Sequence, residues 1–406
     1  MFDPNNRPRR HPHARTITWV SFQVLDRMLS KTAYFEISEH LAERGNHIDF
    51  FGIRSDNAIE ADDTHIRLIL IPLRCFPILT HMFYVTFLAL VLPFYVAVRR
   101  PSFILTEPKF GSPIVGVVLR FFPRQLRPKA IMDIRSTPVE IHSLRASLGA
   151  LAFDASIVLA KKTFDGFTIV TQSMKKEISE RFRIKPEAIK VWNNGVNLEL
   201  FRPEAFNRNV MRKKLGLTGK FIVFYHGSFS AHRGIIEAIE SISILREEYP
   251  DLILFLLGGG PARFLIEELV QKRQLQNRVI VHTPVEYVDV PKFIAMCDLG
   301  IVPLPDILDW RYQCPLKLIE YLSMGKPVVV TDIPANREVT RESEFTIYVP
   351  SANPEEFARA IKYACNNIAK LEKSGVAGRQ VIEDRYDWRK IAHEFENYLN
   401  EFSHDH

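Results

Sequence analysis

The stretch CPLKLIEYLSMGKPVVV, residues 314–330, contains a helix-forming segment followed directly by a strand-forming one. Its first part carries apolar residues at helical spacing, and the pair GK separates it from a continuous apolar run at 328–330. A short strand that is apolar at every position is typical of a parallel sheet covered by helices on both faces. This stretch therefore predicts an α/β domain.

The same alternation continues through the C-terminal half of the chain. Apolar, β-branched runs predict strands at 221–226, 252–258, 278–282, 299–303, 327–331 and 345–349. Helical patterns separate them at 234–247, 262–274, 287–296, 315–324 and 354–367. Strands and helices that alternate in this way predict a Rossmann-like domain.

The N-terminal half repeats this theme less regularly. Strands are expected at 16–22, 47–53, 66–73, 102–106, 130–134, 167–171 and 189–192, with helices such as 34–44 and 173–183 between them. A chain of 406 residues is long enough for two domains. The polar segment 193–206 reads as the linker, so we expect domains at 1–195 and 196–384 and a last amphipathic helix within 385–406. No GxGxxG motif follows the first strand, which argues against a dinucleotide cofactor.

Cysteine use and charge limit the classes of function. The four cysteines lie far apart without a CxxC pair, which argues against a disulfide framework or a zinc site and suits a reducing cytoplasm. The polar, basic N-terminus has no apolar core of a secretory signal. Residues 1–200 carry 27 basic against 19 acidic side chains, so the N-terminal half is the part expected to face an anionic partner, unless this is simply a solvated basic surface.

One apolar segment, 75–98, is long enough to span a bilayer. It lies between two strands expected in one sheet, so we favour a helix that is buried or lies in a membrane interface over a spanning helix. Seven basic side chains and one glutamate follow it within 99–129. A basic surface beside an apolar helix indicates peripheral contact with an anionic membrane.

Two charged residues interrupt the apolar helix quoted above. Pro315 suits the first helical position, which places Lys317 in the first turn together with Leu316. A lysine there opposes the helix dipole, but it becomes favourable if a phosphate binds between the helix start and the ammonium. Glu320, one turn on, could accept hydrogen bonds from ribose hydroxyls of the same ligand. The alternative is a plain surface ion pair between Lys317 and Glu320.

A second cation is expected at the same edge of the sheet. After the strand 221–226, Gly227 allows a tight turn and Arg233 precedes the next helix. Ligands of open parallel sheets bind at the carboxyl ends of the strands, so Arg233 and Lys317 are predicted to converge on one diphosphate. The glycine run that includes Gly259 and Gly260 ends the next strand at this edge, where the alternative is a tight strand–helix turn without ligand contact.

The order NNGVNLELF (193–201), HGSFSAHRG (226–234), LLGGGP (256–261) and PLKLIEYLSMGKPVV (315–329) resembles the retaining glycosyltransferases of family 4. The resemblance implies the GT-B fold, with two Rossmann-like domains whose parallel sheets face each other across a cleft. It implies that Arg233 and Lys317 bind the diphosphate of a nucleotide sugar and that Glu320 holds the ribose. It also implies that the last helix returns to the first domain.

Three departures from the family pattern concern the reaction centre. The first glutamate of the family's E-x7-E pattern is replaced by Tyr312, and Ser228 stands where arginine is often found. The N-domain histidine of the family has no counterpart, and Asp133 and Arg135 are the nearest candidates. Backbone groups around Pro315 and Leu316 are expected to take over part of the donor contact.

The resulting expectation is an enzyme that moves a sugar from a nucleotide-diphosphate sugar to a hydroxyl of a glycan or lipid-linked acceptor. No DxD motif is present, so we expect metal-independent transfer without a cofactor, by a cytoplasmic or peripheral membrane protein. The alternatives are a protein that binds nucleotide sugar without turnover and a nucleotide-sugar 2-epimerase. Nucleic-acid binding is not expected, since no recognised module accompanies the basic half.

Overall fold

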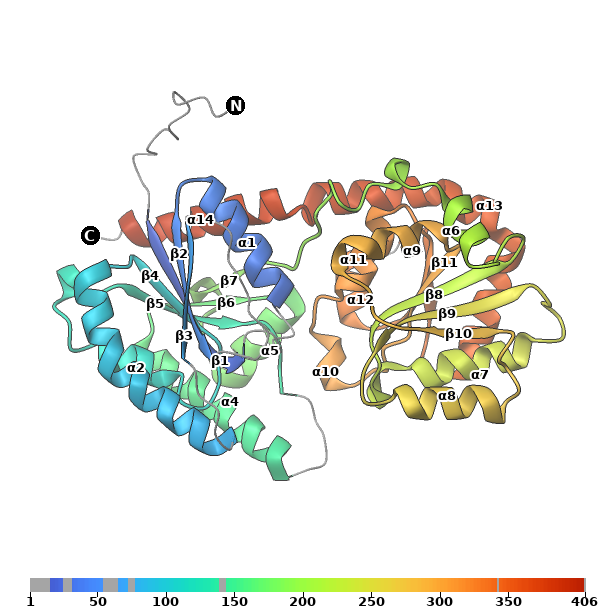
Figure 1. Ribbon diagram of the computed structural model, residues 1–406. Helices are drawn as coiled ribbons and strands as arrows, with labels where there is room; N and C mark the ends of the chain where they lie inside the picture. Colours follow the sequence, from blue (N-terminus) through green and yellow to red (C-terminus); the bar gives the residue numbers. More distant parts are fainter. Residues whose placement is uncertain are drawn as a thin grey trace. The chain divides into compact units, whose positions relative to one another are not determined.

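The computed structural model describes residues 15–24, 31–53, 65–71, 77–138, 144–341 and 343–404. Cys75 and Phe76, the first residues of the apolar segment considered above, lie outside these ranges. The chain divides into two compact units: unit 1 comprises Met1–Asn193 and Trp388–His406, and unit 2 comprises Asn194–Asp387. Each unit is built around one parallel sheet with helices on both faces (Figure 1).

Unit 1 contains a seven-stranded sheet of order β3-β2-β1-β4-β5-β6-β7, in which every described pairing is parallel. Its strands are β1 (Thr16–Val24), β2 (His47–Ile53), β3 (Ile66–Ile71), β4 (Phe103–Thr106), β5 (Lys129–Ile134), β6 (Gly166–Ile169) and β7 (Ile189–Val191). All seven strands expected from the sequence are therefore confirmed. The order reverses between β1 and β4, which is the arrangement of a doubly wound Rossmann sheet.

The helices of unit 1 form two layers. Helix α1 (Lys31–Glu43) packs against α14 (Trp388–His404), and both contribute to one apolar core with the sheet residues Trp19 and Phe50. On the other side of the sheet lie α2 (Pro77–Arg99) and α4 (Leu144–Thr163) (Figure 1). Helix α3 (Pro113–Leu119) contacts both of them. Helix α5 (Gln172–Phe182) connects β6 to β7, and the short helices η2 (Arg124–Leu126) and η3 (Pro186–Ala188) lie in loops.

The apolar helix α2 is attached to this sheet by one of its faces. Tyr84 packs edge-on against Phe22 of β1, with ring centroids 5.3 Å apart. The Tyr95 hydroxyl donates to Oδ2 of the buried Asp49 on β2 at 2.6 Å. Among the described residues, α2 contains the single stretch, Thr80–Arg99, whose length and composition would allow it to cross a bilayer. These contacts place it instead as a surface helix of unit 1.

Unit 2 contains a six-stranded parallel sheet of order β10-β9-β8-β11-β12-β13. Its strands are β8 (Phe221–Ser228), β9 (Leu252–Gly259), β10 (Val279–His282), β11 (Leu299–Val302), β12 (Val328–Thr331) and β13 (Thr346–Val349). All six correspond to predicted strands. The order reverses between β8 and β11, so the switch point of this sheet lies beside the end of β8.

The helices of unit 2 differ from the prediction mainly in length and in three short additions. They are α6 (Arg208–Lys214), α7 (Ile235–Leu245), α8 (Arg263–Lys272), α9 (Val290–Met296), α10 (Leu308–Arg311), α11 (Leu316–Ser323), α12 (Pro334–Thr340) and α13 (Pro354–Arg385), with short helices η4 (Pro203–Ala205), η5 (Ala231–Arg233) and η6 (Tyr287–Asp289). Helix α13 has a kink at Asn367, φ −126° and ψ 17°, so its first helical segment ends at the predicted position and a second segment follows. Helices α6, α10 and α12 and this second segment of α13 were not predicted.

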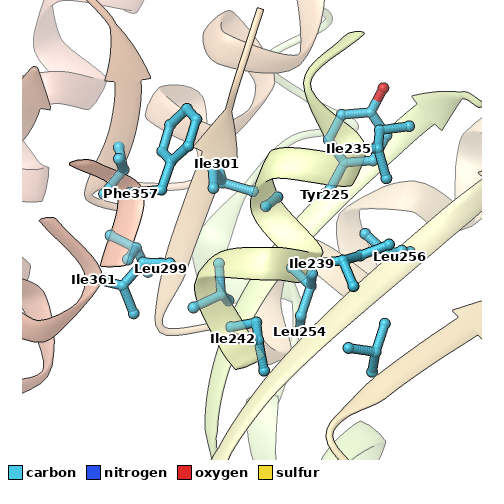
Figure 2. Packing of buried hydrophobic residues seen from close by; sticks show 14 of the residues in the cluster. Tyr225, Ile235, Ile239, Ile242, Leu254, Leu256, Leu299, Ile301, Phe357 and Ile361 are labelled. Atoms are coloured by element: carbon cyan, nitrogen blue, oxygen red, sulfur yellow. The ribbon is translucent and has the colours of Figure 1, made fainter. Parts of the chain in front are cut away.

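The core of unit 2 forms where α7 and α13 cover the sheet. Ile239 and Ile242 of α7 pack over Leu254 and Leu256 of β9 (Figure 2). Phe357 and other side chains of α13 join the same cluster from the neighbouring helix. Burial of these apolar faces fixes β8, which carries part of the candidate site.

Candidate functional site

The candidate site of unit 2 lies where the end of β8 meets the start of α11. Gly227 of β8 has φ +119° and is exposed, and a Cβ atom at this position would lie 3.5 Å from Nζ of Lys317. Helix α11 begins at Leu316, so Lys317 lies in its first turn, as predicted. Because Gly227 has no side chain, the Lys317 ammonium can be approached from the surface at the switch point of the sheet.

Lys317 is a buried cation without a hydrogen-bond partner. Its side chain is 8% exposed, and Nζ lies 3.7 Å from the ring centroid of Tyr225. No hydrogen-bond acceptor contacts Nζ in the described part of the chain. Burial, followed by repulsion from Arg233, lowers the pKa of Lys317 well below its ordinary value, and Glu320 opposes this shift only in part. A buried charge that lacks hydrogen bonds is costly, so the site is prepared for an anion that supplies them.

Arg233 is the second cation of the site. It ends η5, and Gly234 follows it with φ +70°, where a Cβ atom would come within 1.7 Å of the Pro303 carbonyl oxygen. The guanidinium lies over the ring of Trp310, 4.6 Å from its centroid. The Tyr225 hydroxyl donates to the Ser228 carbonyl oxygen at 2.9 Å, and burial raises the pKa of Tyr225 to about 12 although the nearby Arg233 lowers it. Arg233 and Lys317 therefore share Tyr225 as a neighbour, so the fold brings the two cations together, and their contact with a diphosphate stays a prediction.

Glu320 lies one turn after Lys317 and is buried. Its Oε2 atom is 3.1 Å from Nε2 of His226, the residue before Gly227 on β8. His226 packs edge-on against Tyr321, with ring centroids 5.2 Å apart. The pairing of Glu320 with a histidine rules out the surface pair with Lys317 that was the simple alternative. His226 was missed from the sequence, although its place at the end of a strand, directly before Gly227, could have suggested it.

The glycine run after β9 forms a tight turn. The pairing of β8 with β9 continues to Gly227–Gly258 and Ser228–Gly259. A Cβ atom on Gly258 would come within 1.9 Å of the Gly227 carbonyl oxygen, and one on Gly260 within 2.4 Å of the Phe229 carbonyl oxygen. Glycine is therefore needed at both positions for backbone packing. The role of Gly259 and Gly260 in ligand contact stays a prediction.

The loop before α11 is held by the NNG segment. Nδ2 of Asn194 donates to the Cys314 carbonyl oxygen at 3.0 Å. Pro315, with φ −76°, is the N-cap residue of α11. The sequence suggested instead that it would be the first residue of the helix. Tyr312, which replaces the family glutamate, ends the short helix α10 at its C-cap. Asn194 thus positions the backbone from which the first turn of α11 and Lys317 follow.

Asp133 and Arg135 lie in unit 1, at the end of β5. Asp133 has no exposed surface, and its carboxylate accepts hydrogen bonds from Thr168 at 2.7 Å, Tyr34 at 2.9 Å and Trp192 Nε1 at 3.0 Å. Arg135 lies over the Trp192 ring, 3.6 Å from its centroid, and donates to the Trp192 carbonyl oxygen at 2.7 Å. Burial raises the pKa of Asp133, while Arg135 and the three donors oppose the rise. This geometry favours a positioning role for both residues.

No arrangement of three or more His, Cys, Asp or Glu side chains suited to a metal ion occurs in the described ranges of the chain. Lys317 and Arg233 are both cationic, so the part of the site that they share suits an anionic ligand.

Two family models match the chain and together extend over most of it. "Glycosyltransferase Family 4" matches residues 31–200, and "Glycosyl transferases group 1" matches residues 207–381. The chain belongs to the family 4 glycosyltransferases. The predicted resemblance to this family is therefore confirmed.

Solved structures of similar proteins show the GT-B fold for this family 4 chain. Sucrose-phosphate synthase from Thermosynechococcus elongatus is 20% identical, with a TM-score of 0.79 over 96% of this chain and 99% of that one. Anabaena HepE in complex with UDP-glucose is 15% identical, with a TM-score of 0.74 over 95% of this chain and all of that one. The predicted α/β, GT-B fold class is thus confirmed.

Relatives found by sequence comparison align with only part of this chain and of their own length. Spore coat protein SA of Bacillus subtilis is 25% identical over 247 residues, which cover 57% of this chain and 63% of the relative. A second B. subtilis relative, the putative glycosyltransferase YtcC, is 24% identical over 57% of its own length. The chain thus spans less than two thirds of the curated relatives that it matches here.

Proposed function

We propose that this chain transfers a sugar from a nucleotide-diphosphate sugar to an acceptor hydroxyl. The observation that carries this proposal is the buried Lys317 ammonium, which lacks a hydrogen-bond partner at the start of α11. Its neighbour Arg233 and the free backbone N–H groups of the first helical turn complete a site for two phosphates. Solved neighbours of the same fold include HepE, whose structure contains UDP-glucose.

The mechanism follows from where charge develops. Breaking the bond between sugar and diphosphate leaves negative charge on the departing phosphate, and Lys317 and Arg233 are fixed beside that position. Fixed donors of this kind stabilise the charge that develops in the transition state, as an oxyanion hole does. Removal of one such donor typically lowers turnover by about a hundredfold or more. Glu320, oriented by His226, would accept hydrogen bonds from the ribose hydroxyls. Ser228, Gly227 and the backbone of Pro315 and Leu316 would border the donor.

Several finer features of the reaction are part of the same proposal. Transfer is expected to retain the configuration of the sugar, as in the resembling family, and to need no metal, since two cations already face the phosphates. Unit 1 is proposed to bind the acceptor, a glycan or a lipid-linked sugar. The buried Cys297 forms no disulfide in the described part of the chain, which suits a cytoplasmic location.

The test is substitution of the two cations. Lys317→Ala and Arg233→Ala should each lower turnover of a donor such as UDP-glucose or GDP-mannose by at least tenfold, with the far-UV circular dichroism unchanged. The matched control is Lys213→Ala, an exposed lysine of α6 in the same unit, which should leave turnover unchanged. Near-normal turnover in both site variants would overturn the assignment.

Two other outcomes separate the remaining alternatives. Thermal stabilisation by UDP or GDP without any sugar release or transfer would indicate a binding protein without turnover. Conversion of the donor sugar to its 2-epimer would indicate an epimerase. In either outcome the binding role of Lys317 could hold while the transferase reaction would be rejected.

A further inference from the structure

Unit 1 exposes an unusual amount of apolar surface on one layer of helices. Every large apolar side chain of unit 1 that is exposed among the described residues lies within 82–159, on α2, α3, α4 or the loops between them. None lies on α1, α5 or α14. Exposed apolar side chains that gather on one face mark an interaction surface.

Helix α2 contributes the first part of this surface. Its sheet-facing side, with Tyr84, Leu88 and Tyr95, is buried, so the helix is already attached to the protein. The opposite side presents large apolar groups to solvent, among them Leu90 and Phe94, and Phe94 is 75% exposed. Polar side chains normally occupy the solvent side of a surface helix, so this helix is apolar on both sides.

The surface continues over α3 and α4. Phe121, which is 85% exposed, follows α3, and Leu148 and Leu151 are exposed on α4. The two helices pack closely. A Cβ atom at Gly116 of α3 would come within 2.7 Å of the ring of Phe164, the residue that follows α4 in the chain. Arg120, at the end of α3, donates to the Lys162 carbonyl oxygen of α4 at 3.0 Å. The three helices therefore present their apolar groups from one layer.

The charges that border α2 and α3 are cationic, while Asp154, the one carboxylate of α4, forms an ion pair with Arg181. Within 77–129 the single carboxylate is Glu107, which is buried, while Arg100, Arg120 and Arg124 are exposed. Arg100 and Arg124 form no ion pair in the described structure. Apolar side chains surrounded by cations fit a surface that combines acyl chains with anionic headgroups.

We propose that the apolar layer of α2, α3 and α4 docks on an anionic lipid bilayer. Phe94, Leu90 and Phe121 enter the boundary between headgroups and acyl chains, and Arg100 and Arg124 contact the lipid phosphates. Tyr95, through its hydrogen bond to Asp49, keeps α2 on the sheet during docking, so the helix lies in the interface and does not cross it. This inference does not depend on the proposed sugar transfer.

Vesicle flotation with the full chain tests the proposal. Binding is expected to vesicles of phosphatidylcholine mixed with phosphatidylglycerol at low salt, with at least tenfold weaker binding to pure phosphatidylcholine. The double variant Leu90→Ser/Phe94→Ser and the double variant Arg100→Gln/Arg124→Gln should each bind at least tenfold more weakly. High salt should weaken the binding of the wild-type chain more than that of the arginine variant.

Matched variants in unit 2 serve as controls. Phe264→Ser on α8 removes an equally exposed aromatic ring, and Lys213→Gln/Lys214→Gln on α6 removes two exposed cations; both should bind vesicles like the wild type. Equal binding to neutral and anionic vesicles, or normal binding by either unit 1 variant, would overturn the proposal. Light scattering that shows a dimer which Leu90→Ser/Phe94→Ser dissociates, without vesicle binding by the wild type, would assign the surface to self-association instead.

Discussion

Asp133 of unit 1 and Lys317 of unit 2 are both buried charges near the carboxyl edge of a parallel sheet, but their surroundings are opposite. Three side chains donate hydrogen bonds to the Asp133 carboxylate, and Arg135 lies nearby. The Lys317 ammonium has an aromatic ring beside it, a second cation near it and no hydrogen-bond acceptor. One charge is satisfied by the protein itself, whereas the other is left for a ligand.

This difference assigns a structural role to Asp133 and a ligand-binding role to Lys317. A buried carboxylate with its hydrogen bonds complete stabilises the elements that supply the donors, here α1, β6 and the segment after β7. A buried ammonium without acceptors costs folding free energy that an anionic ligand can recover on binding. The comparison predicts that removing Asp133 damages the fold, while removing Lys317 damages binding alone.

The largest effect is expected at Asp133. Asp133→Ala leaves three buried donors without their acceptor and Arg135 without a nearby counter-charge, so the free energy of unfolding should fall by about 3 to 5 kcal/mol. Asp133→Asn keeps the volume and one acceptor oxygen and should cost less. Urea denaturation of both variants measures this, and a loss below about 1 kcal/mol in Asp133→Ala would contradict the structural role.

Lys317→Met, unlike Asp133→Ala, should make the protein more stable. Methionine fills a similar volume without a charge, so the free energy of unfolding should rise by about 1 kcal/mol. The affinity for UDP or GDP should nevertheless fall at least tenfold, because one phosphate contact is lost. Denaturation and calorimetric titration on the same preparation give both numbers, and a variant that is both less stable and unchanged in affinity would refute the comparison.

The smallest effect is a coupling of donor binding to pH. The pKa of Lys317 is lowered in the free protein, so the unfolded chain holds the proton more tightly and stability should rise with pH through the folded pKa. A bound diphosphate favours the charged form, so binding should take up a proton and weaken as pH rises through the same range. Titration of UDP above about pH 7.5, where its phosphate no longer titrates, in two buffers of different ionisation enthalpy measures the uptake.

Lys317→Met provides the control for this coupling. The variant lacks the titrating group and should show no proton uptake above the same pH. Equal uptake in wild type and variant would assign the proton to another group.

Much of the fold could be predicted because it depends on local patterns. All thirteen strands were expected from short apolar runs, since a strand covered on both faces is apolar at every position. The meeting of Arg233 with Lys317 could also be predicted, because the carboxyl ends of parallel strands share one edge. The second helical segment of α13, after the kink at Asn367, was not predicted.

The details of the site depend on contacts between distant residues and were less accessible. His226 could not be paired with Glu320 from the sequence, because 94 positions separate them and neither belongs to a repeating pattern. The absence of a partner for Lys317 is a property of the folded environment. Likewise, the three donors around Asp133 come from three separate segments.

Helix α14 has a consequence for how the chain is made. It is the last helix in sequence, yet its residues Trp388, Phe395 and Leu399 lie in the core formed by the first strands. Unit 2 is continuous, so its sheet can form while the chain is still being synthesised, whereas the core of unit 1 remains open until residue 404 has left the ribosome. Nascent unit 1 therefore exposes a hydrophobic face until α14 has been made, and the unit whose strands are made first is closed after unit 2.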